Sequence, residues 1–226
     1  MTAQGLALRG VGIAIEPGSR RRWDRRAGAV TLVENLDLSI ARGECVTLMG
    51  PSGCGKSTLL SFVAGSLDFA FSARGRVFLD GEDVTAWPAE RRRLGLQFQD
   101  DLLFPHLSVA SNLAFGLSAS LRDRDERRAR VQAALAEAGL DGFGKRDPAT
   151  LSGGQRARVA LMRTLLSEPR ALLLDEPFNR LDAKLRGEMR RFVFDHARAR
   201  NLPVLLVTHD EADARAAGGP VLSFPL

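Results

Sequence analysis

The sequence predicts an α/β fold with a largely parallel sheet, an antiparallel β subdomain in its first third and a helical insertion. Short apolar runs that end in polar or glycine-rich turns alternate with longer amphipathic runs, as in folds where helices connect parallel strands. Two segments near the N-terminus show the partial alternation of antiparallel strands, and the strand signal fades between residues 100 and 151. Because 226 residues exceed one typical domain and fall short of two, we expect a single domain over 1–226. A helical subdomain at about 100–156 is inserted in its core.

The individual elements follow from these patterns in chain order. Antiparallel strands are expected at 5–15 and 31–40, with a hairpin where 76–80 leads into Gly81-Glu82. Buried parallel strands are expected at 45–49, 171–174 and 204–207. Helices are expected at 57–64, 108–121, 125–138, 156–166 and 188–199. Gly139 directly follows the third of these helices and fits a helix stop.

Composition and charge narrow the class of protein. Hydrophobic residues make up 45% and charged residues 26%, which excludes a disordered chain, a collagen and a disulfide scaffold. Two cysteines are too few for a disulfide framework, so free thiols in a reducing compartment are expected. The sequence contains neither an apolar run long enough to span a bilayer nor a secretory signal. The net charge of +5 is compatible with a polyanionic partner and equally with solvated arginine-rich faces, such as the basic segment 20–26.

A glycine-rich loop joins the apolar run 45–49 to a helical stretch and matches G-x-x-x-x-G-K-[ST]. It consists of Gly50, Pro51, Ser52, Gly53, Cys54, Gly55, Lys56, Ser57 and Thr58. Glycines let the backbone N–H groups point at phosphate oxygens, and the following helix adds its N-terminal N–H groups and dipole. Lys56 would contact the β- and γ-phosphates, and the Ser57 hydroxyl would bind Mg²⁺. A glycine turn that only caps a helix does not call for a lysine in a chain that otherwise uses arginine.

Two carboxylates follow the apolar run 171–174. A carboxylate at the tip of a buried strand beside a phosphate loop can hold the Mg²⁺ shell, and Asp175 fits that role. Glu176 can orient and polarise a water in line with the γ-phosphorus. A simple Asp-Glu-Pro turn that ends a strand is the alternative interpretation, and the upstream phosphate loop argues against it.

A second phosphate-facing helix N-terminus is predicted at Leu151, Ser152, Gly153, Gly154 and Gln155, just before a helical run. One mononucleotide needs only the first such terminus. We therefore infer that the second serves a nucleotide held by another copy of the chain. An N-cap serine followed by a flexible glycine pair would explain the helix start but not the whole pentapeptide.

At these residues the chain resembles the ATP-binding subunits of bacterial ABC transporters, with similarity spread over 46–214. The matching pieces appear in the family's order at 50–58, Gln99, 151–155, 175–176, 181–182 and 208–210. The resemblance implies a P-loop NTPase (RecA-like) core that binds ATP and Mg²⁺. It also implies a head-to-tail homodimer with two sandwiched ATP molecules. Each ATP would lie between the 50–58 loop of one subunit and Ser152, Gly153, Gly154 and Gln155 of the other.

The resemblance also assigns roles to single residues. Gln99 would contact Mg²⁺ or the attacking water and couple the site to the membrane partner, although Gln97 is an alternative to it. Asp182 would signal across the dimer, and His209 would contact the γ-phosphate. The implied catalytic set is Glu176, His209, Gln99 and Lys56, and the implied metal ligands are Ser57, Gln99 and Asp175.

The segments 99–109 and 182–186 look like the importer branch of the family. The resemblance implies a subunit that is peripheral on the cytoplasmic face of the inner membrane, where the helical subdomain docks a separate transmembrane permease. A solute-binding protein would act through that permease. The short tail after His209 implies that the C-terminal regulatory domain of many sugar-importer subunits is absent and that the last strands are short.

The chain departs from the family at two places. The position of the usual adenine-stacking aromatic falls at Ala27, with Trp23 the nearest aromatic residue. Asn179-Arg180 stands where Ser-Ala or Ser-Asn is usual.

Two other classes of function share some of these sequence features. A non-transport ABC ATPase that acts on nucleic acid would suit the basic charge, but the chain lacks a second cassette and a long coiled-coil insertion. A module that binds nucleotide without hydrolysing it conflicts with the intact pair Asp175-Glu176. We therefore expect a Mg-dependent ATPase that drives a transporter.

Overall fold

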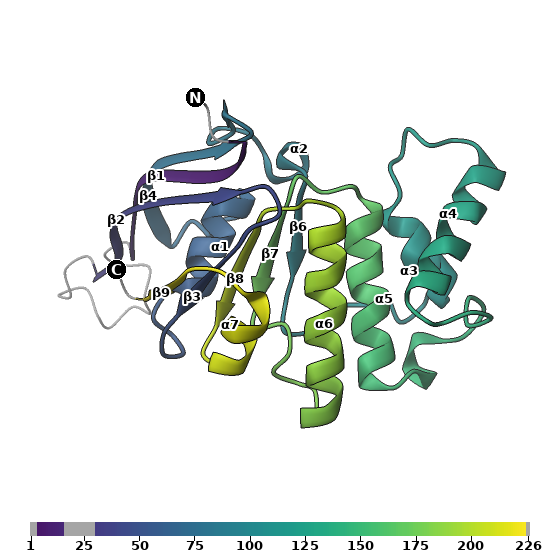
Figure 1. Ribbon diagram of the computed structural model, residues 1–226. Coiled ribbons are helices and arrows are strands. Elements are labelled where there is room, and N and C mark those ends of the chain that lie inside the picture. The colour runs from purple at the N-terminus through teal and green to yellow at the C-terminus, as the bar shows by residue number, and fades with distance from the viewer. Residues whose placement is uncertain (1–3, 16–29, 225–226) are drawn as a thin grey trace.

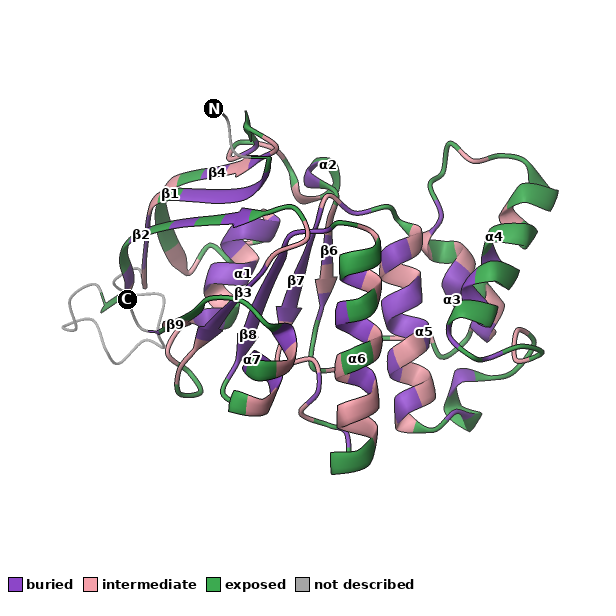
Figure 2. Ribbon diagram, viewed as in Figure 1, coloured by how far each residue is buried: buried purple, intermediate pink, exposed green. Residues whose placement is uncertain are grey.

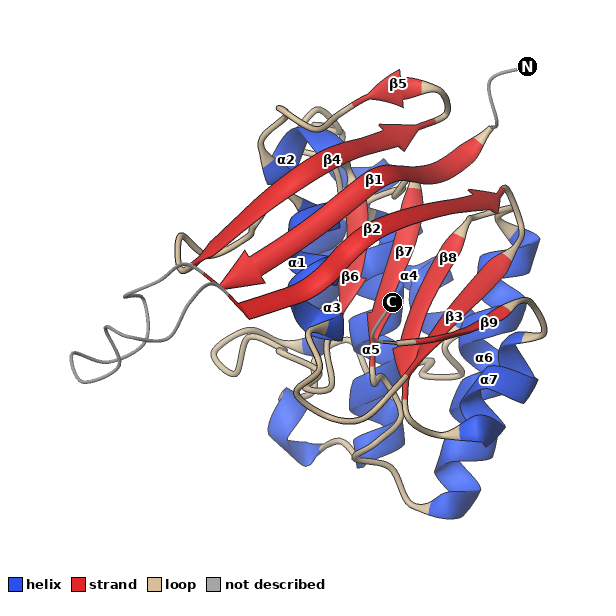
Figure 3. Cartoon of the chain, turned by 90° about the vertical axis from the view of Figure 1, so that its left-hand side faces the viewer, coloured by secondary structure: helices blue, strands red, loops and turns tan. Residues whose placement is uncertain are grey.

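Two sheets organise the chain in the computed structural model, which describes residues 4–15 and 30–224. The first sheet is antiparallel, in the order β2-β1-β4-β5, and the second is parallel, in the order β6-β7-β8-β3-β9. The antiparallel strands are β1 (Gly5–Ile15), β2 (Val30–Ala41), β4 (Phe71–Leu79) and β5 (Glu82–Asp83). The parallel strands are β3 (Cys45–Met49), β6 (Leu94–Gln97), β7 (Ala171–Asp175), β8 (Val204–Thr208) and β9 (Val221–Ser223). Figure 3 shows the antiparallel sheet lying across the parallel one.

The helices divide between the two faces of the parallel sheet. Helix α1 (Lys56–Ala64) packs in the core between the two sheets, where Leu59 and Val63 are fully buried. The opposite face is covered by α5 (Gly153–Leu166), α6 (Ala183–Ala199) and α7 (Glu211–Ala217). Helices α3 (Val109–Gly116) and α4 (Arg124–Glu137) lie at the far end from the antiparallel sheet, beyond α5 (Figure 1). Two short elements remain: α2 (Ala89–Arg92) lies between β5 and β6, and the 3₁₀ turn η1 (Pro148–Thr150) lies between α4 and α5.

The side chains of the parallel strands alternate between two apolar cores. Along β7, Leu172 and Leu174 belong to the core beneath α5 and α6, whereas Ala171 and Leu173 belong to the core that contains α1. Because both of their faces are covered, β7 and β8 read as continuous apolar runs, and they are almost wholly buried (Figure 2).

The expected elements exist, and several differ in extent. The helix expected at 108–121 ends at Gly116, where a Cβ would lie 2.1 Å from the Arg163 carbonyl oxygen of α5. That close approach of α3 to α5 is possible only with glycine at this position, which is the last residue of the helix. Helices α1, α5 and α6 begin earlier than expected, and the expected boundary at 156 falls inside α5. Helix α4 ends just before Gly139, which adopts φ 67° as the predicted helix stop.

Strand β6 was missed by the sequence analysis. It has four residues, and Gly95 and Gln97 interrupt its apolar character, so no pattern of period two or continuous run announced it. It pairs in parallel with β7 and places the segment after Gln97 at the edge of the sheet.

Three sequence-based expectations fall outside the described residues. They are the basic segment 20–26 and the candidate base-stacking positions Trp23 and Ala27. Within the described residues, no helix is long and apolar enough to cross a membrane.

Candidate functional site

The loop 50–58 connects the end of β3 to α1, as the sequence predicted. Gly55 is the N-cap of α1 with φ 103°, a conformation that side chains rarely adopt. A Cβ on Gly50 would meet the Phe224 carbonyl oxygen at 2.1 Å. The loop can therefore follow this path only with glycine at both positions.

Lys56 is the first residue of α1, and only 4% of it is exposed. Its Nζ donates to the carbonyl oxygens of Gly50 at 2.8 Å and Pro51 at 2.7 Å. The Cys54 Sγ lies 3.7 Å from the same nitrogen. The ammonium group is thus held inside the loop that it closes, where an anion could replace the carbonyl oxygens as its partner.

A cavity of about 470 Å³ opens in front of the loop. Its polar side is lined by Ser52, Gly53, Gly55, Lys56, Ser57, Thr58, Gln99, Asp175 and Glu176. Its apolar side is lined by Ile15 on β1, Leu32 on β2 and Phe71 on β4. The polar lining residues suit phosphates and a cation, and the apolar ones suit an apolar part of a ligand.

Strand β7 ends at Asp175 inside this cavity. Burial raises the pKa of Asp175, and the neighbouring Glu176 raises it further. The Ser57 hydroxyl, which hydrogen-bonds to the carboxylate, and Lys56 lower it. Ser57 and Asp175, separated by over a hundred residues, are thus brought together at the mouth of the loop, where their oxygens could bind a cation.

Glu176 directly follows β7 with an unusual φ of 46°, and its N–H donates to the Val207 carbonyl oxygen at 2.9 Å. Its Oε1 lies 3.2 Å from His209 Nδ1. The Asn179 side-chain amide donates to its Oε2. The two predicted residues Glu176 and His209 are therefore brought together, and Asn179 joins them.

A buried charge network holds the segment that carries His209, and the sequence analysis did not identify it. Asp213 on α7 is fully buried and accepts from Arg190 Nε at 2.6 Å and from the Thr208 hydroxyl at 2.8 Å. Asp210 accepts from Arg190 at 3.0 Å and from Arg186 at 3.1 Å. The pKa of Asp210 is lowered, although burial opposes this shift. The carboxylate accepts a hydrogen bond from the Ala212 N–H and is attracted by the two arginines. The apolar spacing of α6 gave no sign that two arginines on it face α7.

Of the two candidate glutamines, Gln99 lines the cavity, whereas Gln97 lies buried on β6. The segment that follows Gln99 is tied to its neighbours: Arg163 of α5 donates to the Leu102 carbonyl oxygen at 2.8 Å. Arg180 forms an ion pair with Asp100, which links this segment to the one after Glu176.

Ser152 is the N-cap of α5 and forms a reciprocal capping box with Gln155. The Ser152 N–H donates to Gln155 Oε1 at 2.9 Å, and the Gln155 N–H donates to the Ser152 hydroxyl at 3.3 Å. In the described part of the chain, no residue of 151–155 lines the cavity of the glycine-rich loop. Gly153 instead lines a second cavity, of about 490 Å³, together with Gln99, Asp101 and Leu181.

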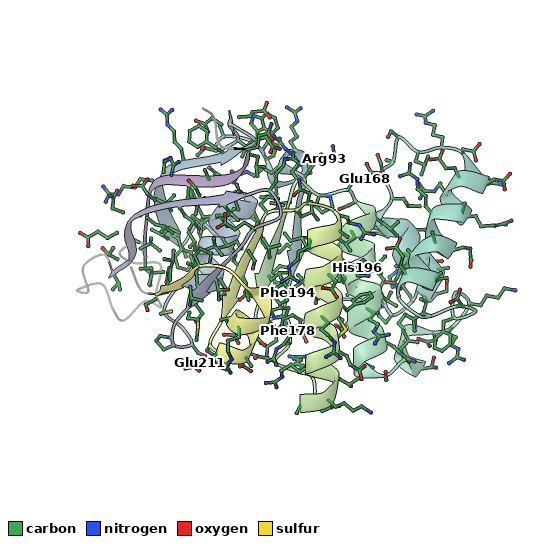
Figure 4. All side chains as sticks on the ribbon, viewed as in Figure 1. Arg93, Glu168, Phe178, Phe194, His196 and Glu211 are labelled. Atoms are coloured by element: carbon green, nitrogen blue, oxygen red, sulfur yellow. The ribbon has the colours of Figure 1, made fainter. Side chains whose placement is uncertain are left out.

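Asp182 is the N-cap of α6 and accepts from the N–H groups of Lys184 and Leu185. Between Glu176 and Asp182 the chain is anchored by Phe178, which is 1% exposed. Phe178 packs edge-to-face against Phe194 of α6 with ring centroids 6.0 Å apart (Figure 4). This contact fixes the segment that carries Asn179 and Arg180.

The sequence matches a family described as "ABC transporter" over residues 33–179. A protein of Escherichia coli K12, named the uncharacterized ABC transporter ATP-binding protein YnjD, is 50% identical over 185 residues. That match covers 82% of this chain and 85% of the relative. The Fe(3+) ions import ATP-binding protein FbpC of Escherichia coli O157:H7 is 43% identical, over 89% of this chain. The match spans 57% of the length of FbpC.

Two solved structures are similar over nearly the whole chain. One is the dimeric, post-hydrolysis state of the ATP-binding cassette MJ0796 bound to ADP and Pi, with a TM-score of 0.77 and 29% identity. That similarity covers 96% of this chain and 93% of the other. The second is cbiO1 from Clostridium perfringens, part of the ABC transporter complex cbiONQ, with a TM-score of 0.79 and 27% identity. It covers 98% of this chain and 84% of the other.

Proposed function

This chain belongs to the ABC transporter family as an ATP-binding subunit, and we propose that it hydrolyses ATP with Mg²⁺ to drive solute import through a separate membrane permease. The single observation that carries the proposal is one cavity lined by the glycine-rich loop, Asp175 and Glu176. A cavity with this lining has a phosphate cradle, oxygen ligands for a cation and a base for water.

The phosphates of ATP would lie against the backbone N–H groups of 50–58 at the start of α1. Lys56 would exchange its bonds to Gly50 and Pro51 for phosphate oxygens. The adenine base of ATP would lie toward the apolar residues Ile15, Leu32 and Phe71.

The residues present suit Mg²⁺, which prefers hard oxygen ligands and keeps several waters. Asp175 and the Ser57 hydroxyl already approach one another, and Gln99 lines the same cavity. When bound, Mg²⁺ would neutralise charge on the phosphates. Burial disfavours the ionised form of the Asp175 carboxyl, and a bound cation would offset that cost.

Glu176 would accept a proton from the attacking water, and His209 would hold the geometry of attack. The contact between Glu176 Oε1 and His209 Nδ1, 3.2 Å long, supports this pairing. Lys56 and the helix N-termini would stabilise the charge that develops on the transferred phosphoryl group.

A second copy of the chain would complete the site. Ser152, Gly153, Gly154 and Gln155 begin a 14-residue helix, α5, whose N-terminal N–H groups and dipole suit an anion. Since the described residues of 151–155 do not line the chain's own cavity, we propose that they contact ATP held by a partner subunit. Asp182 would lie near that interface. The dimeric cassette MJ0796, bound to ADP and Pi, supports this arrangement.

Import, the permease and the location at the cytoplasmic face of the inner membrane are parts of the same proposal. The relatives named FbpC are Fe(3+) import proteins, and cbiO1 is part of a transporter complex. A solute-binding protein would act through the permease.

The test replaces Glu176 by glutamine. We expect Glu176→Gln to keep ATP affinity and to lower ATP turnover at least about a hundredfold, because the isosteric amide cannot accept the proton. Phosphate release and binding of a fluorescent ATP analogue measure the two effects. Glu90→Gln is the control, because Glu90 is exposed on α2. Turnover within about threefold of wild type would remove Glu176 from the role of base.

A further inference from the structure

We propose that Asn179 is a positioning residue that holds the Glu176 carboxylate in place for the attack of water. This inference rests on the proposed function, because it assigns a role within the same hydrolytic site. It concerns a position at which the chain departs from the family's usual serine.

The two oxygens of Glu176 have different partners. Oε2 accepts from the Asn179 side-chain amide, and Oε1 lies 3.2 Å from His209 Nδ1. The nitrogen of the Asn179 amide must face Oε2, because a carboxylate only accepts hydrogen bonds. With one donor on each oxygen, the carboxylate cannot rotate about its terminal torsion without losing both bonds.

Asn179 is the better-anchored of the two partners. The side chain of His209 is half exposed, whereas Asn179 follows Phe178, which is buried against Phe194. The Asn179 N–H also donates to the Glu176 carbonyl oxygen at 3.3 Å, and the Leu181 N–H donates to the Phe178 carbonyl oxygen at 3.1 Å. These bonds form a tight turn whose position relative to β7 is set by core packing.

The arrangement assigns different tasks to the two oxygens. The resemblance to ABC subunits implies that His209 contacts the γ-phosphate of bound ATP, and such a contact would draw His209 away from Oε1 and leave Oε1 to accept a proton from water. Asn179 would still hold Oε2, so the carboxylate would keep its orientation at the moment of reaction. A catalytic carboxylate lowers the barrier most when its orientation is established before the reaction begins.

An asparagine suits this task better than the shorter side chains. Its amide nitrogen stands one atom farther from the backbone than a serine hydroxyl, so it reaches across the turn to Oε2. An alanine at this position would leave Oε2 without a protein donor among the described residues.

The experiment measures kcat and KM for ATP in the full chain carrying Asn179→Ala, Asn179→Ser or Asn179→Asp. We expect Asn179→Ala to lower kcat about tenfold while KM stays within about twofold, since a hydrogen bond to a charged group is lost and no ATP contact is touched. Asn179→Asp keeps the shape but removes the donor, and it should lower kcat at least as much. Asn179→Ser retains a donor and should recover part of the loss. It also provides a readout if the alanine variant does not fold.

Asn35→Ala is the matched control, because Asn35 is an exposed asparagine on β2 and is expected to leave both constants unchanged. A double-mutant cycle separates positioning from structure. In a Glu176→Gln background, Asn179→Ala should change the residual turnover less than about twofold, because the base that it positions is gone. Residual turnover is followed as phosphate accumulated from radiolabelled ATP.

Two results would overturn the inference while leaving the proposed function intact. The first is a kcat for Asn179→Ala within about twofold of wild type. The second is the same tenfold loss with and without Glu176→Gln, which would make Asn179 merely structural. Full turnover in Glu176→Gln itself would remove Glu176 from the role of base, and the inference with it, whereas an absence of ATP hydrolysis in the wild-type chain would overturn the proposed function.

Discussion

The buried carboxylate of Asp213 provides a test of what holds the segment 208–210 in place. Asp213 is fully buried on α7 and accepts from Arg190 Nε at 2.6 Å and from the Thr208 hydroxyl. The substitution Asp213→Asn keeps its shape and removes its charge. It leaves Arg190, whose side chain is 14% exposed, with Asp210 as its remaining carboxylate partner at 3.0 Å.

The expected loss of stability follows from this geometry. Breaking a buried ion pair by removing one partner costs about 3–5 kcal/mol, because the other charge stays buried without compensation. Arg190 retains Asp210, so the cost should fall at the lower end, about 3 kcal/mol. For a chain of this length that corresponds to a fall in Tm of roughly 6–12 °C.

Urea unfolding followed by circular dichroism measures the change as a lower midpoint at constant slope. Glu211→Gln on the same helix is the control. Glu211 and Arg215 form an ion pair with side chains 77% and 71% exposed, for which we expect a change below about 1 kcal/mol. Equal effects of the two substitutions would refute the idea that burial gives the Asp213 pair its importance.

Two further predictions follow from single groups. Burial raises the pKa of the Cys45 thiol to about 12, so at pH 8 iodoacetamide should alkylate Cys54, in the glycine-rich loop, well before Cys45. Mass spectrometry of the peptides measures the two rates, and faster labelling of Cys45 would contradict the prediction. Burial and the nearby Arg200 lower the pKa of His196, so below pH 6.5 the unfolded chain binds the proton more readily and stability falls with acidification. The urea midpoint of unfolding should therefore fall less between pH 7.5 and 5.5 in His196→Asn than in the wild-type chain. An equal fall in both would show that other groups cause the acid sensitivity.

Much of the site could be predicted because its chemistry is written in short local patterns. Lys56 and its glycines had to follow a strand and open a helix, and they do. Asp175 and Glu176 stand at the end of a buried strand, where a carboxylate can face the cavity instead of the apolar core. Ser152 and Gln155 have the spacing of a capping box, which is a property of a single helical turn.

Other features had no local signal. Strand β6 is stabilised by its neighbour β7 and not by its own sequence, so it was missed. At the end of α3, Gly116 lies against the backbone of α5, nearly fifty residues later in the chain. The same is true of the apolar side of the cavity, where Ile15, Leu32 and Phe71 arrive from three different strands.

The sequence by itself therefore determined the phosphate loop, the carboxylates and the strands and helices that carry them, because each depends on residues within one or two turns of chain. Only the tertiary structure decided what those groups touch. It placed Asn179 against Glu176 and Gln99 rather than Gln97 in the cavity, and it set the two arginines of α6 against Asp210 and Asp213. Such contacts join residues on separate elements, and their distances depend on how the two sheets and the helices pack.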